Sequence, residues 1–449
     1  SRPTVAPVRC LAMLFLLGWK GCPEGTARSV PPAGLLAGQP AVWYNRPAMP
    51  VTLTVTAGPH AGRTFTFDQH ETFLVGRTED CHFRFSFDDP YFSRRHFLIE
   101  VNPPRCRVMD LKSRNGIKVN GERVDVGDLK DGDEVQAGHT VFRVSVSWPA
   151  EPGIPSTLVE PRPPSSATVE YTPPAVTVAG FRVEREIGRG CMGVVYRAVR
   201  ETDGMVVALK TIAPAPGVAA KQVARFLREA EVLAKLRHPN IVGLVEAGEA
   251  GGLVYLAMEH LTGPDASRVL KERGPQKPRT AVRLISQVLT GLQHAHEQGF
   301  VHRDIKPSNI LLHAVAEKRL AKLADFGLAR AFESSRMSGI TMQGEVGGTP
   351  AFMAPEQVSH YRDVLPAADQ YSVAATLYNL LTDRYPYELP KNVGQQLVMI
   401  LTEPPVPIRD RDPGIDAGLA GVIHKAMSRE PAERFPDAAA FRKALQPYA

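Results

Sequence analysis

Hydrophobic and polar residues alternate in short runs over residues 51–146 of this 449-residue chain. Runs such as LTVTA, RTFTF, HFRFSF and TVFRVSV have a period of two, which places successive side chains on opposite faces of a strand. Gly, Asn, Asp and Pro occupy the segments between the runs and are typical of turns. The pattern predicts an antiparallel β-sandwich, a fold that carries its specificity in its loops.

The pattern is different after residue 180. Residues 194–199 are rich in β-branched residues and predict a strand, and VALK at 207–210 predicts a second, buried strand. Residues 221–236 instead carry an apolar stripe at helical spacing, which includes Phe226. Strands followed by an amphipathic helix are therefore expected here.

A glycine-rich string precedes the first of these strands. Gly188, Gly190 and Gly193 match the pattern GxGxxGxV, in which residues without a Cβ let backbone amides close over phosphate oxygens. A GxGxxG string also fits a dinucleotide-binding turn, but that interpretation needs a helix directly after the glycines, where this chain has a strand pattern. Lys210, 17 residues beyond Gly193, can deliver an ammonium group to the α- and β-phosphates of a nucleotide.

Two further strings, HRDIKPSN at 302–309 and DFG at 325–327, carry groups suited to phosphoryl transfer. Such a reaction needs a base for the hydroxyl, oxygen ligands for magnesium and cations on the phosphates. Asp304 can accept or orient the hydroxyl proton, and Lys306 can neutralise charge on the γ-phosphoryl group. Asn309 and Asp325 supply hard oxygen donors of the kind that Mg²⁺ prefers.

Taken in order, the glycine string, VALK, HRDIKPSN, DFG and an APE triplet at 354–356 resemble the protein kinase superfamily of the bacterial serine/threonine type, over about residues 181–445. The resemblance implies a bilobal α+β kinase fold, ATP and Mg²⁺ as cofactors, and proteins with serine or threonine as substrates. A lysine at the position of Lys306 resembles the pattern of serine/threonine kinases rather than that of tyrosine kinases. Because Ser308 replaces an acidic residue found in many arginine-directed kinases, no basic substrate motif is predicted.

The resemblance also assigns roles to individual residues. Asp304 and Lys306 would be catalytic, and Asn309 and Asp325 would bind the metal ion. Lys210 would pair with Glu229 on the predicted helix, a role for which Glu231 competes. The residues expected at the ATP site are Ile187, Gly188, Gly190, Gly193, Val195, Ala208, Lys210, Glu229, Met258, Glu259 and Leu261.

Residues with a role in holding the fold follow from the same resemblance. Asp369 would brace the catalytic loop, and Arg434 would pair with Glu356. A scaffold that has a kinase fold without transferase activity is the main alternative, but the catalytic residues are intact. A small-molecule kinase is disfavoured because Thr349 and the APE triplet resemble a segment that holds an extended peptide.

Regulation by phosphorylation is expected in the segment 332–346. Arg303 beside the catalytic aspartate resembles kinases whose activation loop is ordered by a phosphate group, and Ser338 and Thr341 are the favoured sites among the hydroxyls of that segment. Cys191 in the glycine string could act as an oxidation switch, but a tolerated small residue is the preferred interpretation.

The loops of the predicted sandwich carry a second set of motifs. Gly76 and Arg77, SRRH at 93–96, SRNG at 113–116 and VNG at 119–121 resemble the forkhead-associated (FHA) domain, a reader of phosphothreonine. The resemblance implies that some of these loop residues bind the phosphate and the peptide, while His96 acts as an internal brace. The implied phosphothreonine site consists of Arg77, Ser93, Arg94, Arg114 and Asn115, of which Arg114 stands where some family members have a hydroxyl.

These patterns divide the chain into a poorly ordered segment at 1–49, an FHA domain at 50–147, a linker at 148–180 and a kinase domain at 181–447. The linker is rich in Pro, Ser and Thr and has no apolar period, so it keeps the FHA domain at high local concentration near its own kinase. Self-recognition through phosphorylated segments, including the linker threonines, is one hypothesis. Recruitment of a separate phosphorylated partner is the other. The linker threonines are Thr157, Thr168, Thr172 and Thr177.

Composition limits the compartment and the partners. The net charge of +6 is modest for this length and shows no clustered basic stripe, so no nucleic-acid partner is expected. Five cysteines without a CxxC pair suit a reducing cytoplasm. The apolar run CLAMLFLLGW at 10–19 is too short to span a membrane, and a signal peptide is disfavoured because a kinase needs ATP.

Overall fold

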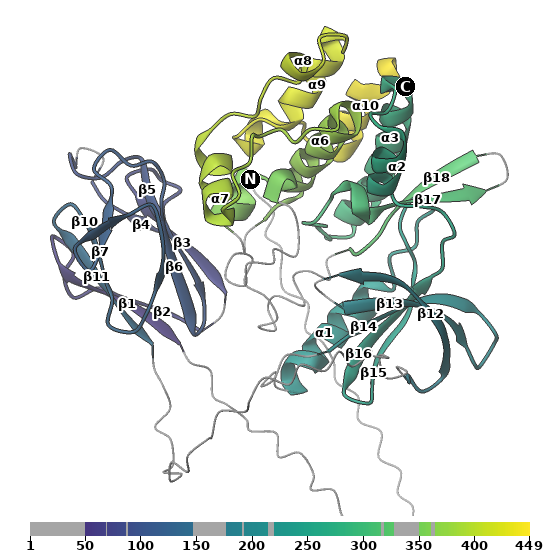
Figure 1. Ribbon diagram of the computed structural model, residues 1–449, viewed down its shortest axis with the longest axis horizontal. Helices are drawn as coiled ribbons and strands as arrows, with labels where there is room; N and C mark the ends of the chain where they lie inside the picture. Colours follow the sequence, from purple (N-terminus) through teal and green to yellow (C-terminus); the bar gives the residue numbers. More distant parts are fainter. Residues whose placement is uncertain are drawn as a thin grey trace, which may run out of the picture. The chain divides into compact units, whose positions relative to one another are not determined.

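The alternating runs of residues 51–146 fold into two packed sheets, so the predicted β-sandwich is confirmed (Figure 1). One sheet has the order β2-β1-β11-β10-β7-β8 and the other has the order β4-β3-β5-β6-β9. The pairs are antiparallel except for β3 with β4. The strands are β1 (Val51–Ala57), β2 (Thr64–Phe67), β3 (Glu71–Gly76), β4 (Phe83–Arg84), β5 (Arg95–Asn102), β6 (Arg105–Asp110), β7 (Ile117–Val119), β8 (Glu122–Val124), β9 (Val126–Leu129), β10 (Glu134–Ala137) and β11 (Thr140–Val146).

Alternate residues of these strands form the core between the two sheets. On β1, Val51, Leu53 and Val55 are fully buried, and the residues between them are not. Phe97 on β5 meets Phe142 on β11 edge to face, with the ring centroids 5.6 Å apart. The sheets therefore pack through apolar and aromatic side chains, and the connecting loops are left at the ends of the sandwich.

The strands and the helix predicted after residue 180 form a further sheet with one helix against it. The antiparallel sheet has the order β12-β13-β14-β16-β15. Phe226 and Ala230 of α1 are buried in the hydrophobic core of this domain. The elements are β12 (Phe181–Gly190), β13 (Gly193–Arg200), β14 (Val206–Ile212), α1 (Ala220–Leu233), β15 (Leu244–Ala250) and β16 (Leu253–Glu259).

Helices and one hairpin make up the rest of the residues that the structure describes, and this helical lobe after the sheet completes the predicted bilobal α+β fold (Figure 1). Every residue of α6 from Ala368 to Leu381 is buried, because other elements surround this helix. The elements are α2 (Ala266–Arg273), α3 (Pro278–Glu297), η1 (Pro307–Asn309), β17 (Ile310–Val315), β18 (Lys318–Leu323), η2 (Pro350–Phe352), α5 (Pro355–Ser359), α6 (Pro366–Thr382), α7 (Val393–Thr402), α8 (Ile408–Arg411), α9 (Ala417–Ala426), η4 (Pro431–Glu433), α10 (Ala438–Leu445) and η5 (Gln446–Tyr448).

The computed structural model describes residues 50–68, 70–86, 89–146, 177–190, 193–213, 220–315, 318–326, 350–360 and 364–449. Below, residues 50–146 are called the N-terminal sandwich and residues 177–449 the C-terminal domain; both lie in one compact unit that begins at Asn45. The expectations for residues 1–49 and for most of the linker lie outside the described residues. Within the described ranges no helix is long and apolar enough to cross a membrane.

Candidate active site and phosphate-binding site

Asp304, Lys306 and Asn309 meet in the loop between α3 and β17. Lys306 Nζ donates to Asp304 Oδ1 at 3.0 Å and to Oδ2 at 2.8 Å. Asn309 Nδ2 donates to the Asp304 carbonyl oxygen at 2.7 Å and to its Oδ2 at 3.0 Å. Because the nitrogen of the Asn309 amide is used in this way, its oxygen is the atom that can bind a metal ion.

A fully buried carboxylate holds the backbone of this loop. Asp369 on α6 accepts hydrogen bonds from the backbone N–H of His302 and from that of Arg303, both at 2.8 Å, as predicted for the residue that braces the loop. His296 Nε2 at the end of α3 contacts the same carboxylate at 2.8 Å. Arg303 has a φ of 70°, which a non-glycine residue rarely adopts. Asp369 therefore stabilises a strained turn immediately before Asp304.

The side chain of His302 links this loop to the DFG segment. Its Nδ1 accepts a hydrogen bond from the Asp304 backbone N–H at 3.2 Å, so the proton must lie on Nε2, which donates to the Ala324 carbonyl oxygen at 2.8 Å. The ring also packs edge to face against Phe326, with the centroids 4.6 Å apart. Asp304 and Asp325 are thus held in neighbouring segments by one buried histidine.

Lys210 and Asp325 form an ion pair in this structure. Lys210 lies on β14, is 6% exposed, and donates from Nζ to Asp325 Oδ1 at 2.9 Å. Burial raises the pKa of Asp325, but the charge of Lys210 and its hydrogen bond outweigh the burial, so the pKa lies below its ordinary value. The carboxyl group of Asp325 is therefore ionised at neutral pH.

Glu229 does not meet Lys210 in this structure. It pairs instead with Arg225, one turn earlier on α1, at 3.1 Å, and 37% of its side chain is exposed. Both residues of that pair lie on the same helix at a spacing of four, so the pair forms without any tertiary contact. Lys210 and Asp325 come together across the site, while Glu229 stays on the outer part of its helix.

The residues predicted to contact ATP lie on adjacent strands. Ile187, Gly188 and Gly190 lie on β12, and Gly193 and Val195 on β13. Gly193 has a φ of 137°, and a Cβ there would lie 2.0 Å from the Thr211 carbonyl oxygen, so no other residue fits this backbone. Ala208 on β14 pairs in register with Met258 on β16, and Leu261 follows that strand.

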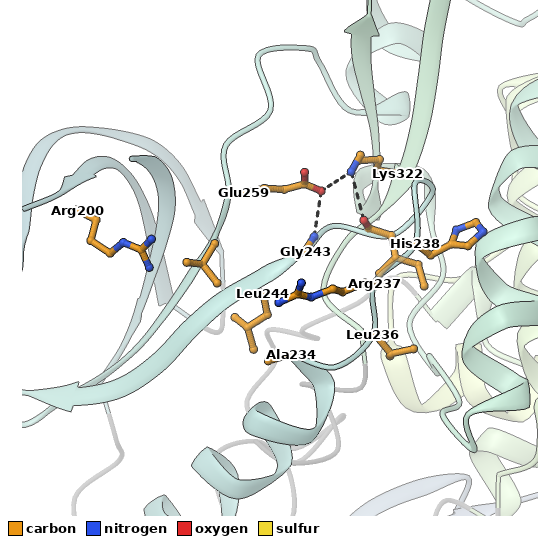
Figure 2. Close-up of a pocket in the computed structure, with 11 residues that line it drawn as sticks. Arg200, Ala234, Leu236, Arg237, His238, Gly243, Leu244, Glu259 and Lys322 are labelled. Carbon is orange, nitrogen blue, oxygen red and sulfur yellow. Dashed lines mark hydrogen bonds and ion pairs between the residues drawn. The ribbon is translucent and has the colours of Figure 1, made fainter. Parts of the chain in front are cut away.

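The side chain of Glu259 points toward Gly243 and Lys322 (Figure 2). Its Oε1 accepts from the Gly243 backbone N–H at 3.0 Å and from Lys322 Nζ at 2.6 Å. These residues line a cavity of about 480 Å³ that also includes Arg237. Any contact between Glu259 and adenine would therefore come from its backbone and not from its carboxylate.

The pairing predicted between Arg434 and Glu356 is present. Arg434 is 3% exposed, and its guanidinium donates two parallel hydrogen bonds to Glu356, one of them 2.8 Å long from Nη2 to Oε2. A third bond runs from Nη1 to the Ala367 carbonyl oxygen at 2.9 Å. This buried pair joins α5, which follows the APE alanine, to the start of α6.

The N-terminal sandwich has a basic site at its loops. Arg77, Ser93, Arg94 and Arg114 line a single cavity of about 880 Å³. Ser93 Oγ accepts from the Arg114 backbone N–H at 2.9 Å, and the Arg77 backbone N–H donates to the Arg94 carbonyl oxygen at 2.7 Å. The predicted phosphate-binding residues therefore come from three loops that hydrogen bonds hold together.

His96 and Asn115 hold the frame of this site. Ser93 N donates to His96 Nδ1 at 3.1 Å, so Nε2 carries the proton and donates to the Gly116 carbonyl oxygen at 3.2 Å. His96 is fully buried and joins two loops through these bonds, as expected of an internal brace, and its burial lowers the pKa of the ring. Asn115 Nδ2 donates to the Tyr91 carbonyl oxygen at 3.0 Å, so in this structure it fixes a neighbouring loop.

Two further cations near the candidate phosphate site were not among the predicted site residues. Lys112 and Arg95 also line the cavity. Arg95 is the second arginine of SRRH and pairs with Asp80 at 2.6 Å. Lys112 precedes SRNG and has a φ of 54°. Its place directly before the SRNG string is the signal that could have identified it.

Several predicted residues lie outside the described ranges. Ser338 and Thr341, the favoured phosphorylation sites, are among them, as are Cys191 and Thr349. Phe326 is the last described residue before the gap that ends at Pro350. The roles predicted for these residues remain predictions.

Comparisons with known proteins identify both domains. The family model described as protein kinase domain matches residues 181–445, and the model described as FHA domain matches residues 73–138. The serine/threonine-protein kinase pkn3 of Myxococcus xanthus is 37% identical over 270 residues, which are 59% of this chain and 49% of that protein. PknJ of Mycobacterium tuberculosis is 38% identical over 271 residues, 59% of this chain and 45% of that protein.

The chain thus spans about half the length of these curated relatives. Among solved structures, the kinase domain of Mycobacterium tuberculosis PknI is 29% identical, covers 61% of this chain and 98% of its own, and has a TM-score of 0.49. The structure of Rad53 1–466 in complex with AMP-PNP is 22% identical, covers 89% of this chain and 100% of its own, and has a TM-score of 0.47.

Proposed function

Because this chain belongs to the protein kinase family, we propose that it is a serine/threonine protein kinase that transfers the γ-phosphate of ATP to hydroxyl groups of proteins. The single observation that carries the proposal is the convergence of Lys306 and Asn309 on Asp304, with the backbone held by the buried Asp369. A scaffold without transferase activity would have no need to keep this arrangement of charges.

In the proposed reaction Asp304 accepts or orients the proton of the substrate hydroxyl. Its carboxylate is already held by Lys306 and Asn309, so little reorganisation is needed before the reaction. Lys306 Nζ, bonded to both carboxylate oxygens, lies where it can also neutralise negative charge on the transferred phosphoryl group.

The residues that would hold Mg²⁺ are Asn309, through its amide oxygen, and Asp325, through its ionised carboxylate. Two protein oxygens fit this ion, which usually keeps several waters and phosphate oxygens in its coordination shell. Bound there, the ion would neutralise charge on the β- and γ-phosphates. Lys210, now paired with Asp325, would then turn toward the α- and β-phosphates and toward Glu229.

The adenine and the sugar would lie between the glycine-rich hairpin and β16. The proposed lining residues are the predicted positions on β12, β13, β14 and β16, with Met258 beside Ala208. The backbone of Glu259 and Leu261 would face adenine, since the carboxylate of Glu259 is held by Lys322.

The FHA domain would bind phosphothreonine through Arg77 and Ser93, supported by Arg94 and Arg114. Guanidinium groups bind a phosphate dianion through paired N–H donors, and a hydroxyl adds a further hydrogen bond. The bound partner would be either a separate phosphoprotein or a phosphorylated segment of this chain, such as one around Thr341. The proposal also includes activation by phosphorylation of Ser338 or Thr341. It places the protein in the cytoplasm, where ATP is available.

The proposal is tested by incubating the purified protein with ATP and Mg²⁺ beside an Asp304→Asn variant and by locating phosphate with mass spectrometry. We expect incorporation in the wild type and a loss of about 10²–10⁴-fold in the variant, because the variant lacks the base. Nucleotide affinity should be unchanged in the variant. The proposal would be overturned if both proteins incorporated phosphate equally, or if the wild type phosphorylated neither itself nor any protein substrate tried. The chain would then be a scaffold with a kinase fold and no transferase activity.

A further inference from the structure

The sheet β4-β3-β5-β6-β9 of the N-terminal sandwich is apolar on both of its faces. Its inner face contributes Phe73 and Phe97 to the sandwich core. On its outer face Leu74, Leu98 and Met109 are paired in register on three adjacent strands, and the row ends at Val126 on β9. The outer face of a sandwich sheet is normally polar because it meets water. This apolar row must therefore pack against another apolar surface.

Helix α7 of the C-terminal domain is also apolar on more than one side. LVMIL at 397–401 places five consecutive apolar residues on a helix, so they point to every side of it. Leu397, Val398, Ile400 and Leu401 are at most 7% exposed. They belong to the hydrophobic cluster that contains Leu74 and Leu98, and not to the main core of the C-terminal domain.

Specific close contacts accompany this apolar cluster. Gly394, near the start of α7, lies so close to the sandwich that a Cβ there would be 2.9 Å from Val126 Cγ1. Thr72 Oγ1 on β3 donates to the Ser359 carbonyl oxygen at 3.0 Å, and both residues are buried.

His360 adds a polar contact next to that one. Its Nε2 lies 2.8 Å from the Asp80 carbonyl oxygen, which can only accept, so the histidine donates. Its other ring nitrogen lies 2.8 Å from Ser359 Oγ. These bonds lie beside α5, so they connect the sandwich to the segment directly after the APE triplet.

We propose that the outer face of the FHA sheet is an intramolecular docking surface whose occupant is α7 of the same chain, together with Ser359 and His360. The docking surface is defined by Leu74, Leu98, Met109, Leu111 and Val126. This goes beyond the proposed function, because it depends neither on phosphoryl transfer nor on phosphothreonine binding.

The docking has a consequence for the phosphate site. The cavity that Arg77 and Ser93 line is bordered on its other side by Leu401, Arg429 and Glu430. Arg429 holds the end of α7, since Nη2 donates to the Glu403 carbonyl oxygen at 2.7 Å. A phosphorylated peptide bound by the FHA domain would therefore also contact the kinase domain of the docked chain.

The experiment uses the full chain with a protease site inserted between residues 155 and 165, which lie outside the described ranges. After cleavage the two halves should stay together on a sizing column at micromolar concentration. Leu98→Asp should weaken this association by about 100-fold or more, because it buries a charge in the apolar row. Leu365→Asp is the matched control, since Leu365 is 67% exposed on the C-terminal domain, and should change nothing.

A second variant separates docking from misfolding. Gly394→Gln improves the helix propensity of α7 but places a side chain against Val126. We expect it to weaken association by about 10-fold while the C-terminal half unfolds no more easily. Separation of the wild-type halves, or co-elution of both variants at wild-type affinity, would overturn the proposal. A dimer of the uncut chain that Leu98→Asp dissociates would overturn it too, because the occupant would then be a second copy.

Discussion

Replacing Asp369 by asparagine should disable the catalytic loop without altering any residue that touches the substrate. The carboxylate accepts from the backbone N–H groups of His302 and Arg303 and contacts His296 Nε2, and it is fully buried. An amide has only one oxygen, so at least one N–H donor of the loop would face an NH₂ group.

The expected losses of stability and of activity follow from these contacts. A hydrogen bond to a charged group contributes about 1.5–3 kcal/mol, and a buried donor left without an acceptor costs about 1–3 kcal/mol. Asp369→Asn should therefore destabilise the C-terminal domain by about 2–4 kcal/mol. The release of the turn at Arg303, whose φ is 70°, should move Asp304 and lower kcat by about 10²-fold.

Urea unfolding followed by circular dichroism at 222 nm measures the first effect, because every α-helix of the described residues lies in the C-terminal domain. Phosphate transfer at saturating ATP measures the second. Asp383→Asn is the matched control: it lies at the other end of α6, is exposed, and has a φ of 53° that asparagine adopts easily. An Asp369→Asn variant that matches the control in both assays would refute the reasoning.

Three further predictions concern other parts of the molecule. Gly193→Ala should lower ATP affinity at least 10-fold, measured by calorimetry, because its Cβ would lie 2.0 Å from the Thr211 carbonyl oxygen. Arg77→Lys should weaken binding of a phosphothreonine peptide by at least 10-fold in fluorescence anisotropy, since lysine cannot make paired hydrogen bonds. Lys210→Met should destabilise the domain at pH 7, and the difference from wild type should shrink as the pH falls through the pKa of Asp325, which Lys210 holds below its ordinary 3.8.

Much of this architecture could be predicted from the sequence because it rests on local patterns. The period of two over residues 51–146 specified the sandwich, since one face of each strand had to be buried. The order of HRDIKPSN, DFG and APE specified the second domain. The bracing role of Asp369 and the pair of Arg434 with Glu356 could be predicted only through the resemblance, because these contacts join residues 66 and 78 positions apart.

The partner of a charged side chain is less predictable than its position. The sequence predicted Glu229 as the partner of Lys210, with Glu231 as the competitor, whereas the structure pairs Lys210 with Asp325. Glu229 is bonded to Arg225 instead, and the carboxylate that Lys210 can reach depends on where α1 lies against the sheet. That position depends on the packing of a whole helix, which no short motif encodes.

The interface between the two domains could be predicted from the sequence only in part. Five consecutive apolar residues at 397–401 exceed what one face of a helix can bury against its own domain. Leu74 and Leu98 likewise break the alternation that a solvent-facing sheet would need. Each excess of apolar residues indicates that a cover exists, but neither one identifies it. Because the two surfaces lie on one chain and both need burial, their association costs less entropy than binding a separate protein would, which favours docking within the chain.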